Sequence, residues 1–432
     1  MWVRTLDSPM QALRPPALRS AVVLAFVAAA AACSSPPSTP RALESASRSE
    51  PAPAPAAAPD AGAEEAPTGR LALLDKLGAP RQFLIGHGND LPGEYTGLTG
   101  TQPAIYGLPH KLDIHYAYLS GVSGETLDGG PSWPEYEPDG GFVTTIANMD
   151  ASRGVTPMFT LYQHAARGEK NFAAFRDEGF MQRYWHGVRL LFTRLGAFGK
   201  PAMVHLEPDF WGFAQEAHGD DPASMPVVVR ALVPECKDLP DDVSGMGRCI
   251  VRLSRQLAPK VLIGMHASGF GALGEPKRVA AYLTKVGARE GDFIVLETLD
   301  RDAGCFETKN DPNCQRDDGA LYWDESNERS PNFHDHLRWV REIYAGLGGK
   351  PVMWWQMPLG VPNDEPGGAP GRYRDNRVRY LFDHPDEFAG AGGFAAVFGV
   401  GAPNQTNIQT DGGQFSRAIT KYYASPLPIT EP

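Results

Sequence analysis

The chain has 432 residues, of which 42% are hydrophobic and 21% charged, so it can bury a large core in one big domain or two ordinary ones. Its formal net charge is −11, and it contains no long basic run. An acidic protein of this kind is a poor candidate for binding nucleic acid or an anionic membrane surface.

The first 33 residues read as an export signal. Arg4, Arg14 and Arg19 precede an apolar run over residues 21–32 that is too short to span a bilayer, and Cys33 follows it. The segment Ala30-Ala31-Ala32-Cys33 resembles a bacterial lipobox, in which the cysteine is lipidated and becomes the mature N-terminus. The resemblance implies an exported lipoprotein, periplasmic or at the cell surface, that reaches the membrane only through its lipidated N-terminus. Ordinary Ala-x-Ala cleavage that leaves Cys33 as a free cysteine is the alternative.

Residues 34–68 form a Pro/Ala-rich stretch with almost no large apolar side chains. Nothing in it can offset the entropy of ordering, so we predict a semi-extended tether. The sequence therefore divides into a signal peptide (1–33), a disordered tether (34–68) and a folded domain (69–432).

Four cysteines remain in the folded domain: Cys236, Cys249, Cys305 and Cys314. An even number in an exported chain indicates disulfides. Among the three possible connectivities we predict the near-neighbour pairs Cys236–Cys249 and Cys305–Cys314. A metal site is less favoured, because the chain has no Cys-x-x-Cys spacing.

From residue 80 onward, short runs of β-type residues alternate with longer stretches of helical period, as in a parallel sheet with crossover helices. The predicted strands are 82–86, 111–118, 156–162, 202–206, 261–265, 292–296, 351–355 and 393–398. This count predicts an α/β fold, a (β/α)8 TIM barrel. An open doubly wound sheet is the alternative, but the segment that begins at Gly86 is not a Gly-x-Gly-x-x-Gly phosphate loop.

The domain is longer than a typical barrel of about 250 residues. The excess falls in long loops that follow strands, on the C-terminal rim where barrel active sites are built: 121–140, 212–242, 303–330 and 359–374. Helices are predicted over 171–196 and 332–347. The loop aromatics Trp133, Tyr136, Tyr322 and Trp323 are either walls of a cleft or flaps packed on the barrel.

Polar and aromatic side chains gather where the predicted strands end. The candidate substrate-binding residues there are His87, Asp90, Gln163, Asp209, Trp211, His266, Asp300, Trp355 and Gln356. Amides and carboxylates pair with hydroxyl groups, and indole faces stack on sugar rings, so this set predicts a carbohydrate site. Several of these residues also have a purely structural interpretation. His87 and His266 can simply hydrogen-bond to a neighbouring loop, and the segment 300–302 can be an internal salt-bridge cluster. His115 and His205, which lie within strands, are predicted to be satisfied histidines of the barrel.

The fourth predicted strand ends in Glu207-Pro208-Asp209. In this feature the domain resembles the barrel glycoside hydrolases over roughly residues 80–425. In their large retaining clan, a Glu followed by Pro at this place is the acid/base, within an Asn-Glu-Pro motif. The chain departs from that motif twice: Leu206 replaces the Asn, and Gln356 stands where the clan's nucleophile would end the seventh strand. The Glu-Pro-Asp also resembles that of inverting cellobiohydrolase-type cellulases.

Because Gln356 cannot form a glycosyl ester, Glu297 after the sixth strand is the best remaining partner for Glu207. Phe210 and Trp211 should desolvate Glu207, raise its pKa and suit it to donate a proton. Arg301 should keep Glu297 ionised as nucleophile or base. Alternatively, Glu207 and Asp209 only cap or bridge a strand-to-helix junction.

The predicted function is therefore an exported glycoside hydrolase that needs no cofactor or metal. One alternative is a non-catalytic carbohydrate-binding lipoprotein on the same barrel. A less favoured one is a phosphodiesterase or metal-dependent hydrolase that uses His87, His164 and His266 with Asp90.

Overall fold

The computed structural model of the chain describes residues 69–88, 104–125, 130–270, 274–298, 301–315, 322–362 and 367–430. Eight parallel strands pair in sequence order, and β1 closes the barrel against β8, with Leu84 opposite Ala395. The strands are β1 (Leu84–Gly88), β2 (Ile114–Ser120), β3 (Thr156–Tyr162), β4 (Ala202–Leu206), β5 (Val261–His266), β6 (Phe293–Leu296), β7 (Val352–Met357) and β8 (Gly393–Phe398). The predicted (β/α)8 barrel is confirmed, and the open doubly wound sheet is excluded.

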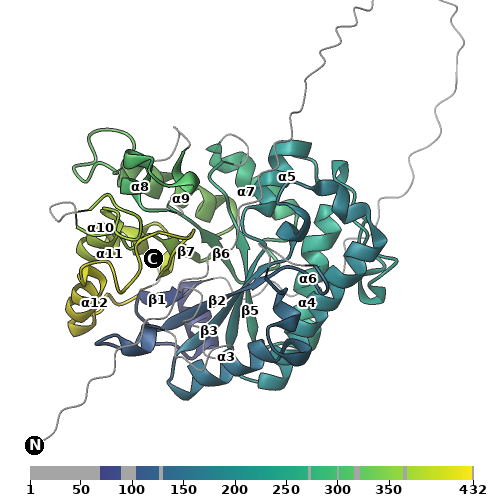
Figure 1. Cartoon of the computed structure of the whole chain (residues 1–432). Coiled ribbons are helices and arrows are strands. Elements are labelled where there is room, and N and C mark those ends of the chain that lie inside the picture. Colours follow the sequence, from purple (N-terminus) through teal and green to yellow (C-terminus); the bar gives the residue numbers. More distant parts are fainter. Residues whose placement is uncertain are drawn as a thin grey trace, which may run out of the picture. The chain divides into compact units, whose positions relative to one another are not determined.

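Helices surround the strands (Figure 1). They are α1 (Arg70–Leu77), α3 (Gly141–Ser152), α4 (Glu178–Phe198), α5 (Phe210–His218), α6 (Val243–Leu257), α7 (Pro276–Lys285), α8 (Ala303–Thr308), α9 (Phe333–Gly346), α10 (Arg377–Asp383), α11 (Pro385–Gly390) and α12 (Gln414–Ala424). Among the described residues, no helix is both long and apolar enough to cross a bilayer.

The predicted helix over 171–196 is two elements in the structure. A 3-10 turn (Phe172–Arg176) precedes α4, because the Asp177 side chain accepts a hydrogen bond from the backbone N–H of Phe180 and starts a new helix there. The helix ends at Gly199, which adopts a left-handed conformation with φ 68°. The helix predicted over 332–347 matches α9, which the Asn332 side chain caps.

The barrel interior is filled by large side chains. Tyr116, His205 and Trp355 come from β2, β4 and β7, which are not neighbours in the barrel, yet the Trp355 ring lies 6.1 Å from Tyr116 and 4.8 Å from His205. Such contacts are possible only across the inside. The adjacent Trp354 points the other way, where its ring packs against Phe388 of α11.

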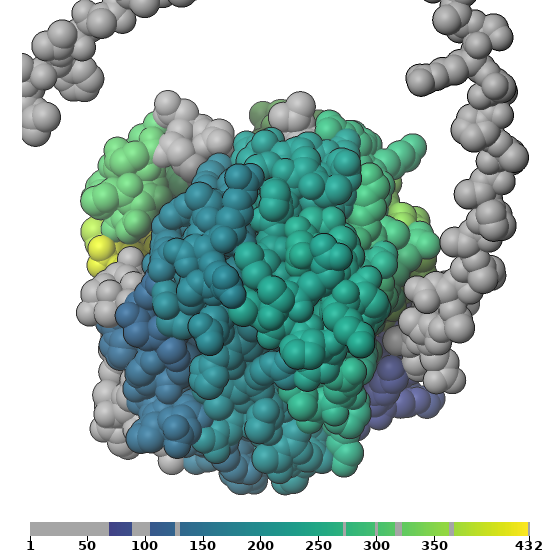
Figure 2. Space-filling model, turned by 90° about the vertical axis from the view of Figure 1, so that its right-hand side faces the viewer, coloured from purple at the N-terminus to yellow at the C-terminus, as the bar shows by residue number. Residues whose placement is uncertain are grey.

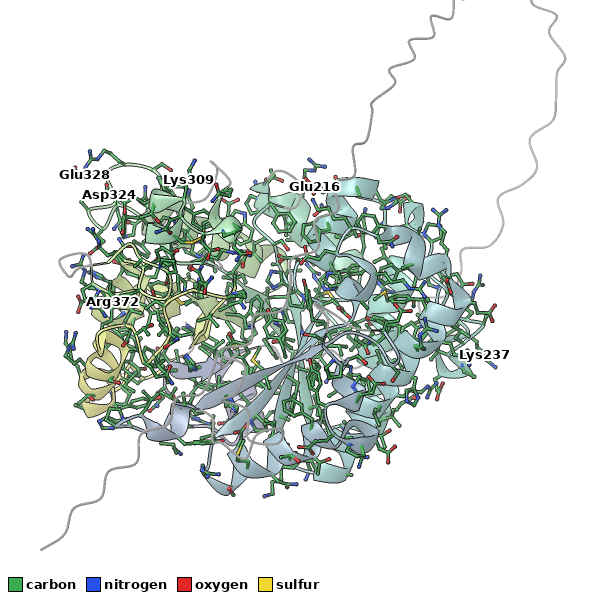
Figure 3. The ribbon with its side chains drawn as sticks, in the orientation of Figure 1. Glu216, Lys237, Lys309, Asp324, Glu328 and Arg372 are labelled. Atoms are coloured by element: carbon green, nitrogen blue, oxygen red, sulfur yellow. A yellow bond between two sulfur atoms is a disulfide. The ribbon has the colours of Figure 1, made fainter. Side chains whose placement is uncertain are left out.

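The long segments that follow the strands lie on the C-terminal rim as predicted, but they are not all irregular. Helix α5 occupies the start of the segment 212–242, and α8 the start of 303–330. In Figure 2, segments from the middle of the chain, coloured teal, form much of the face turned toward the viewer. Charged side chains such as Glu216 and Lys237 project from the outer surface, as Figure 3 shows.

Candidate functional site

Three of the predicted residues converge at the carboxyl ends of neighbouring strands. Asp209, His266 and Glu297 follow or end β4, β5 and β6, and one polar atom from each lies within 4.8 Å of the other two. His266 is fully buried, whereas the Asp209 side chain is 26% exposed. The Oγ of Ser268 donates a hydrogen bond of 3.3 Å to Oδ1 of Asp209. The cluster is therefore a set of two carboxylates and an imidazole at the mouth of the barrel.

The backbone turns sharply where β4 ends. Glu207 and Asp209 both have positive φ angles, 44° and 64°, a region that residues with side chains seldom adopt. Asp209 is also the residue before helix α5. Conformations of this kind cost free energy and cluster at functional sites. The turn directs the two acidic side chains into different surroundings.

Neighbouring groups keep Asp209 ionised. Burial by itself would raise the pKa of Asp209, but the contact with His266, the charge of His164 and the hydroxyl of Ser268 lower it below its usual value. Tyr118 of β2 faces the same region, and burial together with the charges of nearby acidic groups, Asp209 and Glu297 among them, raises its pKa well above the usual value. Tyr118 is thus a neutral phenol beside two carboxylates.

A chain of polar contacts runs from the mouth into the barrel. Nδ1 of His266 lies 3.0 Å from Nε2 of His205, and Nδ1 of His205 lies 3.4 Å from Oγ1 of Thr160. Burial and the neighbouring His266 hold the pKa of His205 well below its usual value, so this imidazole is neutral. Trp355 packs edge-on against both rings. His205 is satisfied, as predicted, but it also fixes the orientation of His266.

Glu207 has no exposed surface, and both of its carboxylate oxygens accept hydrogen bonds. Oε2 accepts from the backbone N–H groups of Gln163 and His164, at 3.0 and 3.1 Å, and lies 2.9 Å from Nδ1 of His164. Oε1 accepts from the hydroxyl of Tyr184 on α4, at 2.8 Å. Glu207 thus joins the end of β4 to the segment after β3 and to a helix outside the barrel. These contacts fit the alternative interpretation of Glu207, in which the residue only bridges a strand-to-helix junction. Its assignment as the catalytic acid stays a prediction.

Two residues predicted to bind substrate are buried parts of the scaffold. The amide of Gln163 accepts from the indole N–H of Trp133 and donates to the Tyr184 carbonyl, both at 3.2 Å. Trp211 is fully buried on α5, and its indole N–H donates to the Leu206 carbonyl. Neither side chain has surface to offer a sugar ring. For Trp211 the reason is local, because helix α5 begins at Phe210 and directs the indole into the core.

Gln356 lies at an irregularity in β7, where the pairing with β8 shifts register between Trp354 and Met357. Its φ angle is 52°, and its amide donates to the hydroxyl of Tyr118 at 3.2 Å and to the carbonyl of Val400 at 3.1 Å. The structure therefore connects Gln356, through Tyr118, to the acidic cluster. Strand alternation places Tyr118 on the same face as the interior Tyr116, a signal by which the sequence could have flagged it.

The other predicted site residues are distributed differently. His87 of β1 is buried near Phe415, with 6.1 Å between ring centroids, and Trp355 lies in the barrel interior rather than on an open wall. Asp90, Asp300 and Cys33 lie outside the described residues. Among the described residues, the two groupings of potential metal ligands include neither His87 nor His164, so the predicted histidine set is not assembled.

The two loop tryptophans pack on the barrel, as the second interpretation of the sequence expects. Trp133 is fully buried and forms no cleft wall, whereas Trp323 is nearly buried but lines a pocket on the rim together with Tyr322. Phe270, in the loop after β5, is an exposed aromatic that the sequence prediction did not include. It is 37% exposed, and its ring packs against Phe213 of α5, with 4.8 Å between the ring centroids.

Asp302 belongs to a buried clasp on the rim. Its carboxylate accepts from the backbone N–H groups of Gly360 and Thr406, at 3.1 and 2.7 Å, so it joins the segments after β6, β7 and β8. Burial and the charge of Asp375 raise the pKa of Asp302 to about 8, although the backbone donors oppose the shift. Asp302 therefore holds loops together.

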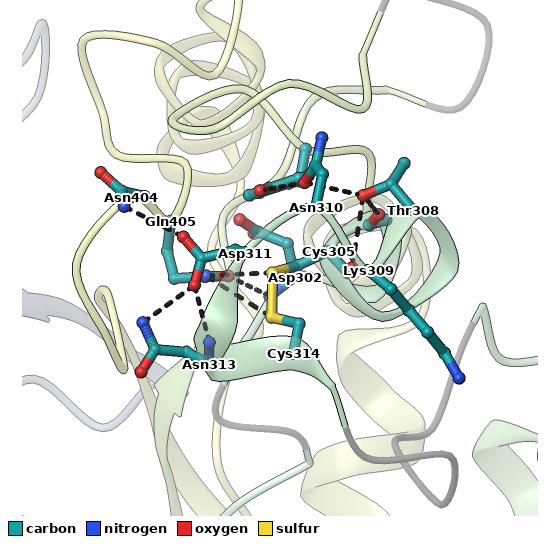
Figure 4. Close-up of a disulfide and its surroundings, with 12 residues drawn as sticks. Asp302, Cys305, Thr308, Lys309, Asn310, Asp311, Asn313, Cys314, Asn404 and Gln405 are labelled. Carbon is teal, nitrogen blue, oxygen red and sulfur yellow. Dashed lines mark hydrogen bonds between the residues drawn. A yellow bond between two sulfur atoms is a disulfide. The ribbon is translucent and has the colours of Figure 1, made fainter. Parts of the chain in front are cut away.

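Both predicted disulfides are present, Cys236–Cys249 and Cys305–Cys314. Figure 4 shows the second one beside the clasp, where the Gln405 amide donates to the sulfur of Cys305 and accepts from the backbone N–H of Asp302. Disulfides are typical of proteins that fold in oxidising compartments.

No protein-family model matches the chain, and no curated protein matches it by sequence. Solved structures do match its fold. The GH53 catalytic domain of Ignisphaera aggregans has a TM-score of 0.46 and 10% identity, over 77% of this chain and 92% of that chain. A beta-mannanase from a symbiotic protist of the termite Reticulitermes speratus also has a TM-score of 0.46 and 10% identity, over 85% and 94%.

A beta-glucosidase from Thermotoga maritima has a TM-score of 0.42 and 12% identity, over 79% of this chain and 98% of that chain. The neighbours named here are glycoside hydrolases, the superfamily that the Glu-Pro motif resembles. At such identities and TM-scores, no family is established for this chain and no activity is transferred to it.

Proposed function

We propose that the protein is an exported glycoside hydrolase whose catalytic pair is Asp209 and Glu297. One observation carries the proposal: two carboxylates from different strand ends have oxygens within 4.8 Å of each other at the barrel mouth. Glycoside hydrolysis needs two carboxyl groups that flank one bond. Glu297 stays in the pair, but the nucleophile role that the sequence predicts for it passes to Asp209. Asp209 also replaces Glu207, which is buried and fully hydrogen-bonded.

The spacing favours a retaining mechanism. Carboxyl groups about 5–5.5 Å apart suit a covalent intermediate, whereas about 6.5–9.5 Å leaves room for an attacking water. Asp209, which His266 keeps ionised, is the nucleophile: its carboxylate attacks the anomeric carbon and forms a glycosyl ester. Glu297 protonates the departing oxygen and then takes a proton from the water that hydrolyses the ester.

Polar groups around the pair supply contacts for sugar hydroxyls. Ser268 and Tyr118 lie beside it, and Gln356 reaches it through the Tyr118 hydroxyl. We keep Asp90 and Asp300 as predicted binding residues, whereas His87 and Trp355 are buried in the barrel and stay only as predictions from the sequence. The two disulfides support folding outside the cytoplasm, and lipidation at Cys33 remains part of the proposal.

The assignment of roles is tested with aryl glycosides. A panel that carries a good leaving group is compared with natural glycans, for Glu297→Ala, Asp209→Ala and the wild type. Departure of an activated phenol needs little protonation, so Glu297→Ala should retain a larger fraction of wild-type rate on the aryl substrates. Asp209→Ala should lose the rate on both, because it removes the attacking atom.

Glu216→Gln is the matched control, since Glu216 is an exposed carboxylate on the adjacent α5. Equal losses for both variants on both substrates would refute the roles. Binding to an insoluble glycan without release of reducing ends, in the wild type, would replace the proposal with a carbohydrate-binding protein.

A further inference from the structure

We propose that Asp209, His266 and Glu297 also form a binding site for a divalent transition-metal ion such as Zn²⁺, and that the bound ion competes with the glycan. The metal site stands on its own geometry. Only the competition rests on the proposed function.

The position of His266 carries the proposal. This histidine is fully buried, and its Nε2 atom makes no hydrogen bond in the structure. Nε2 lies 3.4 Å from Oδ1 of Asp209, close enough for attraction but without the alignment of a hydrogen bond. Two ligands on a tetrahedral zinc ion, each with a bond of about 2.1 Å, are themselves about 3.4 Å apart. The buried nitrogen therefore already stands at ligand spacing from a carboxylate oxygen.

The second ring nitrogen of His266 has a polar partner, as the free nitrogen of a metal-bound histidine usually does. Nδ1 is 3.0 Å from Nε2 of His205, whose Nδ1 in turn is 3.4 Å from the Thr160 hydroxyl. When His266 places its proton on Nδ1 and donates it to His205, the Nε2 lone pair faces the two carboxylates. Such partners orient the imidazole and fix its tautomer.

Charge and ligand type point to the same class of ion. Metal binding releases the proton from a ligand nitrogen, so two carboxylates and an imidazole that binds through Nε2 carry a combined charge of about −2, which a divalent cation neutralises. An imidazole ligand suits Zn²⁺ and similar transition metals better than Mg²⁺ or Ca²⁺, which prefer oxygen ligands alone. The other described grouping, Cys305, Asp311 and Cys314, has its two sulfurs joined in a disulfide and is no candidate.

Metal binding and hydrolysis exclude each other here. An ion that coordinates Asp209 would hold the oxygen that attacks the sugar, and coordination of Glu297 would prevent it from carrying a proton. A transition metal should therefore inhibit the enzyme, and a chelator should reverse the inhibition.

The binding test is calorimetric titration of Zn²⁺ into metal-free protein without a polyhistidine tag, at neutral pH. We expect one ion per wild-type chain, and loss of that binding in His266→Ala and in the nearly isosteric Asp209→Asn. His205→Phe should weaken binding by about 10–100-fold, because it removes the partner of Nδ1. His186→Ala, which alters an exposed histidine on α4, should bind as the wild type does. Circular dichroism confirms that each variant is folded.

No binding by the wild type, or wild-type affinity in folded His266→Ala and Asp209→Asn, overturns the metal site. The competition is tested separately by hydrolysis with and without Zn²⁺. Inhibition that a chelator reverses supports it. Unchanged hydrolysis by ion-loaded protein overturns the competition alone. Hydrolysis that requires the ion overturns both the competition and the two-carboxylate mechanism, while the metal site itself stands.

Discussion

At the scale of single residues, Glu207 shows how a carboxylate beside the proposed active site stabilises the fold. Three donors reach one of its oxygens, and the Tyr184 hydroxyl reaches the other. Hydrogen bonds to a charged acceptor are each worth about 1.5–3 kcal/mol, and buried donors are costly when left unpaired. Glu207 therefore stabilises the junction between β4, the segment after β3, and α4.

We predict that Glu207→Gln lowers the free energy of unfolding by about 1–3 kcal/mol, because the amide keeps an acceptor but loses the charge. Urea unfolding measures this change. Glu216→Gln is the control, since its exposed contact with Lys170 is worth at most about 1 kcal/mol. A Glu207→Gln variant as stable as the wild type but with greatly reduced turnover would return Glu207 to the catalytic pair.

At the scale of elements, the clasp at Asp302 makes the rim sensitive to pH. The pKa of Asp302 is about 8 in the folded protein, against about 3.9 for an unfolded Asp. The folded state thus binds more protons between these values, so the stability that protonated Asp302 contributes is complete below about pH 4 and is lost as pH rises through 8.

Asp302→Asn is neutral at every pH. We therefore predict that its melting temperature falls less than that of the wild type between pH 5 and pH 8. The exposed Asp383, which contacts Lys421, provides the control, and Asp383→Asn should leave the wild-type slope in place. A slope for Asp302→Asn as steep as that of the wild type would contradict the prediction.

The two disulfides also act at this scale, because each links two nearby segments of the chain. Their cysteines are separated by 13 and 9 residues, and cross-links of such short loops are each worth on the order of 2–3 kcal/mol at best. We predict a modest loss of stability when Cys305 and Cys314 are both changed to Ser, measured by urea unfolding. Adding reductant to the wild type should cause a loss at least as large. Four free thiols in protein purified from an oxidising compartment would contradict both pairs.

The strands could be predicted because a buried parallel strand consists of a short run of apolar residues, and such runs are visible in the sequence. The strands 156–162, 202–206 and 393–398 match the prediction residue for residue, and the others differ at their ends by up to three residues. The site depends on local backbone geometry that the sequence does not show. On an extended chain, Glu207 and Asp209 would share a face as residues i and i+2. Their positive φ angles break that alternation.

The partners of Glu207 could not have been found from the sequence. The Tyr184 hydroxyl belongs to a helix, and the N–H groups of Gln163 and His164 belong to a turn after another strand. The acidic residue and its donors are about 20 to 45 positions apart, and only the folded barrel brings them together. The hydrogen-bond partners of Glu207 therefore depend on the tertiary structure and not on any local sequence pattern.

At the scale of the whole molecule, the folded domain should not depend on the segment before it. The described barrel begins at residue 69, and residues 1–68 have a composition that cannot build a core. We predict that truncation of residues 1–68 leaves the melting temperature unchanged and the domain soluble. A matched variant that also removes α1 (Arg70–Leu77) should be destabilised, because Leu73 and Leu74 are buried. A large fall in melting temperature for the shorter truncation would contradict the prediction.

The filled interior limits how a long glycan can approach. Tyr116, His205 and Trp355 close the barrel beneath the acidic cluster, so the mouth has a floor and a polymer cannot thread through from one end to the other. For the proposed hydrolase, a polysaccharide would have to lie across the rim, and both product fragments would leave by the face through which the substrate arrived. The rim loops would then decide which stretch of glycan is bound, and the barrel would decide only where the glycan is cut.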